Sequence, residues 1–118
     1  MTSERGTAPS CRVLVVDDSF IMRRLVREIV ESDEALTVCG MAENGKAALA
    51  LVRSEKPDVV LLDIEMPEMS GLETLRRLGL RSPCKVVILS SLVADEDAAE
   101  RREALRLGAF AAIGKPSG

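Results

Sequence analysis

The chain has 118 residues, 47% of them apolar and only 2% aromatic, and its 16 basic and 19 acidic residues leave a net charge of -3. This length fits one domain with an aliphatic core, and the acidic balance excludes the basic surface that binding to a nucleic acid requires. No apolar run approaches the roughly 20 residues of a membrane span, and the N-terminus has no signal-peptide core. We therefore expect a soluble, cytoplasmic protein that acts on neither a nucleic acid nor a membrane.

The lack of histidine and the wide separation of the cysteines limit the reactions that this chain can carry out. The chain has no histidine, which excludes a Ser-His-Asp site, a His-ligated zinc and a phosphohistidine within this segment. The three cysteines lie far apart with no Cys-x-x-Cys pair, so we expect reduced thiols at Cys11, Cys39 and Cys84. Any reaction here must therefore use carboxylates, hydroxyls or lysines.

A small polar tail over residues 1–10 precedes a single domain over residues 11–118, in which short apolar runs alternate with helical patterns. The runs are rich in β-branched residues and are bounded by turn residues, which is typical of strands buried on both faces. Strands are expected at residues 12–16, 36–41, 59–63, 85–90 and 109–114.

Helical signals occupy the four segments between these strands. Ser19 caps the first helix, and Asn44-Gly45 opens the second. Gly79 ends the third helix and Gly108 the fourth, a mostly solvated helix of alternating charges over residues 95–107. The apolar positions expected to face the sheet are Met22, Leu25, Val26, Ile29 and Val30, then Ala47, Ala48, Leu51 and Val52, then Leu72, Leu75 and Leu78.

Strands that alternate with helices predict an α/β fold with a parallel sheet and right-handed crossovers. A further helix would normally cover the outer face of the last strand, and the sequence stops at Gly118 before one, so we expect a segment of a longer protein. Without that helix, apolar side chains such as Phe110 or Ile113 would be partly uncovered. We therefore expect self-association of this segment.

Polar residues close four of the five strands. Asp17-Asp18 follows the first strand and Asp63 ends the third. Ser90 ends the fourth strand and Lys115 follows the fifth. The carboxyl ends of parallel strands form one edge of a sheet, where ligands bind in folds of this kind. The sequence therefore predicts that these side chains meet.

Three carboxylates at one edge would each resist ionising beside the others, and a hard divalent cation resolves this. Mg²⁺ takes oxygen ligands, keeps several waters, and is commonly held by one or two carboxylates and a phosphoryl group. We expect Asp18 and Asp63 to bind it through their side chains. Asp17 is expected to act through a water molecule, and Glu65 to contribute its backbone carbonyl.

The lysine and the serine at this edge suit a phosphoryl group. Lys115 can neutralise one phosphoryl oxygen, and the Ser90 hydroxyl can donate a hydrogen bond to another. Asp63 is then the nucleophile of an aspartyl-phosphate site. Taken singly, each residue has a commoner structural role as a helix cap, a turn residue, a loop hydroxyl or a surface lysine. Their joint order along the chain is what favours the site.

Four motifs resemble those of the receiver domains of bacterial two-component response regulators: VVDDS at residues 15–19, LDIEMPEMSG at 62–71, LSS at 89–91 and KP at 115–116. The resemblance covers residues 12–118. It implies a flavodoxin-like, doubly wound five-stranded parallel sheet in the order 2-1-3-4-5. It also implies Mg²⁺-dependent transfer of a phosphoryl group from the phosphohistidine of a partner histidine kinase to Asp63.

The N-terminal receiver of chemotaxis protein-glutamate methylesterases is similar to this chain in further detail. The shared motifs are DS at residues 18–19, MRRL at 22–25, GLETL at 71–75, SSL at 90–92 and KPSG at 115–118. In that family, a C-terminal hydrolase domain demethylates chemoreceptor glutamates, and the unphosphorylated receiver blocks its active site. The resemblance implies an attached methylesterase domain and chemoreceptors as partners of the parent protein.

The triad of that hydrolase lies outside this chain, which therefore has no complete hydrolase site, and Ser90 and Ser91 are assigned no nucleophilic role. Two positions depart from the receiver pattern. Ala112 stands three residues before Lys115, where receivers often have a rotating aromatic switch, and Ser70 stands where aspartate is commoner. We therefore expect no inward rotation of an aromatic side chain at the first position.

Three other functions share parts of this pattern. A stand-alone receiver that signals by phosphorylation-dependent partner binding would have the same site, and the reading frame beyond Gly118 would distinguish it. A carboxylate-nucleophile phosphatase also uses Mg²⁺ and aspartate, but it usually has Asp-x-Asp after its first strand, which Asp17-Asp18-Ser19 does not match. The intact acids and lysine disfavour the third, a non-phosphorylated interaction domain.

Overall fold

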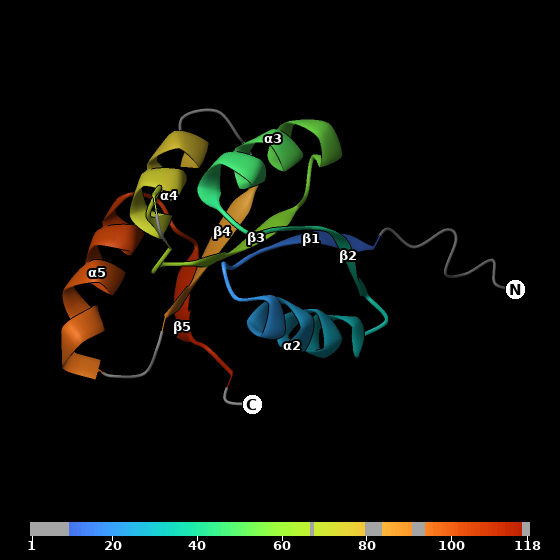
Figure 1. The fold of residues 1–118 in the computed structure, drawn as a ribbon, viewed down its shortest axis with the longest axis horizontal. Coiled ribbons are helices and arrows are strands. Elements are labelled where there is room, and N and C mark those ends of the chain that lie inside the picture. The colour runs from blue at the N-terminus through green and yellow to red at the C-terminus, as the bar shows by residue number, and fades with distance from the viewer. Residues whose placement is uncertain (1–9, 67, 80–83, 91–93, 117–118) are drawn as a thin grey trace, which may run out of the picture.

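The computed structural model describes residues 10–66, 68–79, 84–90 and 94–116. Five parallel strands form its centre in the order β2-β1-β3-β4-β5 (Figure 1). This confirms the flavodoxin-like strand order. Of the expected tail, only Ser10 is among the described residues. Ser91 also lies outside the described residues. The strands are β1 (Cys11–Val16), β2 (Leu36–Ala42), β3 (Val59–Asp63), β4 (Lys85–Ser90) and β5 (Ala111–Gly114).

Helices cover the two faces of this sheet unequally. One helix, α2, packs on one face, while α3, α4 and α5 pack on the other (Figure 1). None of the described helices is both long enough and apolar enough to span a membrane. The helix bounds are α2 (Phe20–Glu31), α3 (Gly45–Glu55), α4 (Gly71–Gly79) and α5 (Ala94–Arg106).

Alternate residues of the central strands enter two separate apolar clusters, because successive side chains of a strand point to opposite faces. Burial on both faces explains why these strands are continuous apolar runs in the sequence. The cluster under α3, α4 and α5 includes Leu14, Val16, Val60, Leu62 and Ile88. The cluster under α2 includes Val13, Val15, Val26, Val30 and Leu89.

The predicted helix ends are confirmed. The Ser19 hydroxyl accepts a hydrogen bond of 3.2 Å from the backbone nitrogen of Met22, and the Asn44 side chain accepts one of 2.8 Å from Ala47. Each thereby satisfies a backbone donor that the first helical turn leaves unpaired. After α5, Gly108 adopts φ +108, a conformation that glycine enters without the steric cost other residues incur.

The bounds of β1, β2 and α5 differ from the prediction by one residue, and two larger differences occur at Ile29 and at β5. Ile29 is half exposed, because the stripe of α2 that packs on the sheet consists of Met22, Val26 and Val30, four residues apart. Strand β5 begins two residues later than predicted. The backbone nitrogen of Ala109 still donates to the carbonyl of Ala104 at the end of α5, so Ala109 belongs to the helix-ending turn.

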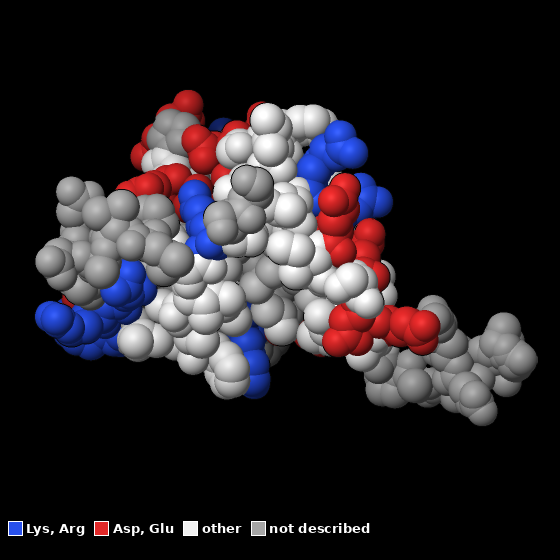
Figure 2. Space-filling view, turned by 90° about the horizontal axis from the view of Figure 1, so that it is seen from below, with Lys and Arg blue, Asp and Glu red and all other residues white. Residues whose placement is uncertain are grey.

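Apolar side chains remain exposed on the α2 side of the sheet and along β5. Phe110 is 65% exposed and Ile113 is 51% exposed, as predicted, and Phe20 and Ile21 at the start of α2 are also exposed. Figure 2 views the molecule from below, which is the α2 side in Figure 1, and uncharged groups occupy most of the middle of this view. An exposed apolar surface of this kind favours self-association.

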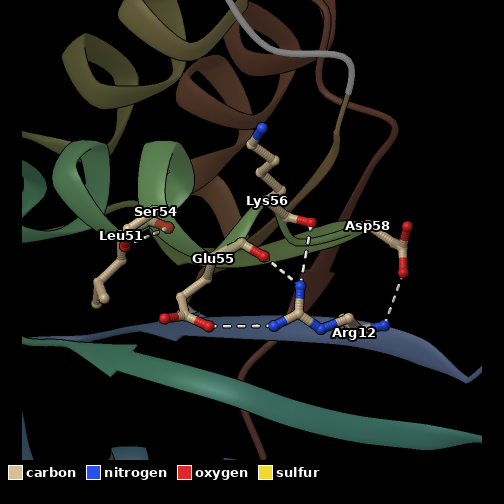
Figure 3. Close-up of polar contacts among 6 residues, drawn as sticks. All are labelled: Arg12, Leu51, Ser54, Glu55, Lys56 and Asp58. Carbon is tan, nitrogen blue, oxygen red and sulfur yellow. Dashed lines mark hydrogen bonds and ion pairs between the residues drawn. The ribbon is translucent and has the colours of Figure 1, made fainter.

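An arginine near the start of β1 ties the sheet to the end of α3 (Figure 3). The Arg12 guanidinium donates to the main-chain carbonyls of Glu55 and Lys56 and forms an ion pair of 3.1 Å with the Glu55 carboxylate. The backbone nitrogen of Arg12 donates to the Asp58 carboxylate at 2.8 Å. These bonds satisfy carbonyls that the last helical turn leaves unpaired, and they anchor the turn that leads into β3.

Candidate functional site

Three side chains from different strand ends meet at one edge of the sheet. Asp17 follows β1, Asp63 ends β3 and Lys115 follows β5. The Lys115 ammonium lies 3.0 Å from Asp63 Oδ1 and 3.8 Å from Asp17 Oδ2. The backbone nitrogen of Lys115 also donates to the carbonyl of Ser90, at 2.8 Å, which places the end of β4 beside the lysine. The structure therefore brings together residues that lie up to 98 positions apart in the sequence.

Three carboxylates form the acidic part of this edge. Asp17, Asp18 and Asp63 each offer an oxygen, and these oxygens lie within 4.8 Å of one another. Asp17 and Asp63 are almost fully buried, with exposed fractions of 1% and 0%, whereas Asp18 is exposed. The cluster thus consists of two buried acids, Asp17 and Asp63, and one solvent-exposed acid, Asp18.

Local backbone bonds hold the two buried acids. Asp17 Oδ1 accepts a hydrogen bond of 2.9 Å from the nitrogen of Ser19, and Asp63 Oδ1 accepts one of 3.1 Å from the nitrogen of Glu65. Such short-range bonds from an aspartate to the backbone two residues later are a common turn device. In both turns, one carboxylate oxygen is anchored by the chain itself.

Glycine is required where the loop after β3 folds back on the strand. A Cβ atom on Gly71 would lie 2.3 Å from the carbonyl oxygen of Asp63 and 2.6 Å from the Cα of Ile64. The Gly71 nitrogen donates to the Ile64 carbonyl at 3.1 Å. The start of α4 is therefore pressed directly against the backbone that carries Asp63.

A second glycine lies on the far side of the same loop. A Cβ atom on Gly45, the first residue of α3, would lie 2.3 Å from the Thr74 hydroxyl oxygen and 2.8 Å from the Met69 sulfur. The Thr74 hydroxyl is buried and donates to the Ser70 carbonyl at 2.9 Å. The loop from β3 to α4 is thus packed between the end of β3 and the start of α3.

Burial dominates the electrostatics of the acids. It raises the pKa of Asp63 to about 6, against the lowering effect of its hydrogen bond with Lys115. Burial also raises the pKa of Asp17. Burial is also the largest single effect on Lys115 and would by itself lower its pKa, but the hydrogen bond to Asp63 and the negative charges of Asp63, Asp17 and Glu65 together raise the pKa of the lysine. Lys115 therefore stays protonated beside two carboxylates whose ionisation costs free energy.

Three buried polar atoms have no hydrogen-bond partner within the described part of the chain: Asp17 Oδ2, Asp63 Oδ2 and Ser90 Oγ. Buried polar atoms are normally paired, so unpaired ones at a single edge point to a ligand. All available donors are oxygens, which suits a hard cation such as Mg²⁺ better than zinc or copper. The residues present therefore fit a magnesium ion and a group that can accept a hydrogen bond from the serine.

Arg23 also contacts this site, although it is not one of the positions of the first helix that were expected to face the sheet. Its Nη1 donates to the main-chain carbonyl of Asp17 at 2.7 Å, and its guanidinium carbon lies 5.7 Å from the centre of the Phe20 ring. Its position in the first turns of a helix that begins at the acid pair is the signal that could have indicated the contact.

The chain matches the family of response regulator receiver domains over residues 13–118. It is 49% identical to a protein-glutamate methylesterase/protein-glutamine glutaminase of Symbiobacterium thermophilum, over 98% of this chain and 32% of that protein. A second such protein, from Pyrococcus abyssi, is 45% identical over 94% of this chain and 30% of its own length. The chain therefore spans about a third of the length of these curated relatives.

Two solved structures show the same fold. The response regulator domain of Thermotoga maritima CheB is 41% identical, with a TM-score of 0.83 over 92% of this chain and 81% of that chain. A CheX-CheY-BeF3-Mg+2 complex from Borrelia burgdorferi is 28% identical, with a TM-score of 0.81 over 96% of this chain and 84% of that chain.

Proposed function

This chain belongs to the response regulator receiver domain family and is a receiver of the CheB type, and we propose that Asp63 accepts a phosphoryl group in a Mg²⁺-dependent reaction. One observation carries the proposal: Lys115 lies between Asp63 and Asp17, while a buried oxygen of each acid has no hydrogen-bond partner. A site built only for stability would pair these oxygens, because a buried unpaired acceptor costs free energy.

The proposed metal ligands are the side chains of Asp18 and Asp63, the backbone carbonyl of Glu65, and Asp17 through a water molecule. When bound, Mg²⁺ supplies positive charge that offsets the repulsion between the carboxylates and an incoming phosphoryl group. The acid cluster of this chain and its likeness to the CheX-CheY-BeF3-Mg+2 complex support this assignment.

The nucleophile in this proposal is Asp63 Oδ2, because Asp63 Oδ1 is already held by Glu65 and Lys115. Oδ2 forms the new bond to phosphorus as the bond from phosphorus to the donor's imidazole nitrogen breaks. The imidazole keeps that electron pair and takes up a proton from solvent. With a pKa of about 6, Asp63 is mostly ionised at neutral pH even before the metal binds.

Two side chains would then bind the transferred group. Lys115 can exchange its bond to Asp63 Oδ1 for one to a phosphoryl oxygen, and the unpartnered Ser90 hydroxyl can donate to another. The phosphoryl group adds about -1.5 to -2 charge and three acceptor oxygens. We expect this to draw the chain around Ser90 and Lys115 toward Asp63, and so to change the surface formed by α5 and β5.

For the parent protein, we propose that this change relieves inhibition of an attached methylesterase domain, as implied by the relatives, which are about three times as long as this chain. The phosphodonor would be the phosphohistidine of a histidine kinase, which suits a chain with no histidine of its own. The substrates of the parent protein would be chemoreceptor glutamates, and the protein would act in the cytoplasm.

The direct test is to incubate the chain with Mg²⁺ and a small acyl phosphate, and to measure intact mass. We expect a mass increase of one phosphoryl group in the wild type, none with a chelator and none in Asp63→Asn. Asp58→Asn is the matched control, because it makes the same chemical change near the opposite end of β3, and it should be phosphorylated like the wild type. An adduct that persists in Asp63→Asn would refute the assignment of the nucleophile.

A further inference from the structure

Asp18, the exposed acid of the cluster, differs from the two buried acids in how its carboxylate is held. No side chain within the described residues donates a hydrogen bond to the Asp18 carboxylate, whereas Asp17 and Asp63 are anchored by backbone nitrogens. The direction in which Asp18 projects is therefore set by its main chain. Whatever fixes the peptide that precedes Asp18 also fixes this carboxylate relative to the other two.

That peptide is held by an arginine. The Nη1 of Arg23 donates to the main-chain carbonyl of Asp17 at 2.7 Å, and this carbonyl belongs to the peptide plane that joins Asp17 to Asp18. The backbone of Arg23 is fixed in turn, because its nitrogen donates to the Ser19 carbonyl at 2.9 Å in the first turn of α2. A rotation of the peptide plane would break the bond from the guanidinium.

The neighbouring phenylalanine supports the same guanidinium. The Arg23 guanidinium carbon lies 5.7 Å from the centre of the Phe20 ring, a distance at which the ring attracts a cation. Phe20 is 61% exposed, so its ring is not occupied by packing in the core. The ring and the guanidinium therefore support each other at the start of α2.

We propose that Arg23, supported by the ring of Phe20, is a positioning residue of the divalent-cation site: it fixes the Asp17–Asp18 peptide so that Asp18 stays beside Asp17 and Asp63. This inference rests on the proposed function, since it assigns a role toward the same cation. Arg23 does not touch the cation or the phosphoryl group. It acts through the direction of the Asp18 carboxylate.

A purely electrostatic role of Arg23 would give a different result on substitution. A cation beside the acids repels a second cation, so charge alone makes Arg23 unfavourable for Mg²⁺ binding. Replacement by lysine separates the two roles, because lysine keeps the charge but lacks the planar group of Nη donors that reaches the carbonyl and stacks on the ring. Arg23→Lys should therefore weaken Mg²⁺ binding if Arg23 positions Asp18, and should leave it unchanged if only charge matters.

The test is a calorimetric titration of the unphosphorylated chain with MgCl₂. We expect Arg23→Lys to weaken binding about tenfold, as is usual when a group that orients a metal ligand is lost. Phe20→Leu, which leaves the arginine in place, should weaken it by about two- to fivefold. Arg24→Lys is the matched control. Arg24 is next to Arg23 in the sequence, its side chain is 63% exposed, and its ion pair with Glu28 is long, at 3.9 Å. This variant should bind like the wild type.

Thermal unfolding in a chelator checks that each variant is folded, and we expect Arg23→Lys to retain the wild-type midpoint while losing Mg²⁺ affinity. The proposal is overturned if Arg23→Lys binds Mg²⁺ as tightly as the wild type, or if Arg24→Lys loses as much affinity. If Arg23→Lys fails to fold, unchanged affinity in Phe20→Leu overturns it. Absence of Mg²⁺ binding by the wild type would instead refute the proposed function, and this inference with it.

Discussion

Asp63 and Asp17 are buried carboxylates that share a single lysine. Two acidic groups against one cation determine how these residues ionise. Burial raises the pKa of both acids, so ionising them inside the protein costs free energy that ionising them in water does not. Without a divalent cation, Lys115 offsets only part of this cost. The two buried acids therefore lower the stability of the chain at neutral pH.

The first prediction concerns the pH dependence of stability in a chelator. The pKa of Asp63 is about 6 in the folded state and near 4 in the unfolded state, so the folded state binds this proton more tightly. Stability attributable to Asp63 therefore falls as the pH rises from about 4 to above 6. Asp63→Asn removes the loss and should stabilise the chain at pH 7.5 by on the order of 1–3 kcal/mol.

Urea unfolding followed by far-ultraviolet circular dichroism is the suitable measurement, because the chain has no tryptophan or tyrosine. The stabilisation by Asp63→Asn should disappear at pH values below the unfolded pKa, where the wild-type carboxyl is protonated in both states. Added Mg²⁺ should stabilise the wild type and not the variant. A variant less stable than the wild type at pH 7.5 would contradict the burial cost assigned to Asp63.

At the scale of elements, the loop between β3 and α4 links the acid of β3 to the packing of two helices. Gly71 lies against the carbonyl of Asp63, while Met69 and Thr74 lie against Gly45 at the start of α3. Most of these contacts leave no room for a further carbon atom. Met69, Gly71 and Thr74 therefore have little freedom to move independently of the elements they contact.

The second prediction follows from this close approach. In Gly71→Ala, the new methyl group would lie 2.3 Å from a backbone oxygen, which cannot rotate away as a side chain would. The backbone at Asp63 must shift, and we expect destabilisation of about 1–3 kcal/mol together with weaker Mg²⁺ binding. Urea unfolding and calorimetric titration measure the two effects.

Gly79→Ala is the control at the other end of the same helix. A Cβ atom there would come no closer than 3.6 Å to any neighbour outside its own helix backbone, the nearest being the carbonyl of Leu107. It should leave Mg²⁺ affinity unchanged and alter stability little. Equal effects from the two substitutions would show that the contact between Gly71 and Asp63 has no special role in the site.

At the scale of the whole molecule, the site and the exposed apolar surface both follow from the topology of the sheet. The acids come from the carboxyl ends of β1 and β3, which are neighbours in the sheet but not in sequence order, and the lysine follows β5, which β4 separates from β3. They meet only in the folded chain. Phe110 and Ile113, near the start and the end of β5 at the edge of the sheet, are left largely uncovered in these 118 residues.

The third prediction is that this 118-residue chain self-associates through that surface. Burying large exposed apolar side chains against a second molecule lowers the free energy, so it favours association. Light scattering across a dilution series should show an apparent mass that rises with concentration. The double variant Phe110→Ser, Ile113→Thr should lower it, since both side chains are exposed and contribute little to the core. A compact monomer at every concentration would contradict the prediction.

The alternation of apolar runs with helical patterns predicted five strands in a parallel sheet, and the resemblance to receiver domains supplied the order of those strands in the sheet. A strand buried on both faces must be a continuous apolar run, and residues 59–63 and 85–90 were predicted with the bounds the structure has. The residue at which such a run stops lies at the edge of the sheet, which is why Asp63 and Lys115 could be expected to meet. Local hydrogen bonds at Ser19 and Asn44 were equally readable, because caps involve residues only three apart.

Only the folded structure shows where the buried stripe of each helix ends and which residues touch across the fold. Helical periodicity includes Ile29 in the apolar stripe of α2, but the position of the helix on the sheet leaves it half exposed. Arg23 and Gly71 act on the acids through contacts with main-chain atoms, and neither contact leaves a pattern in the side chains of its partner. Periodicity reports what one element must bury, whereas contacts between elements depend on how they pack.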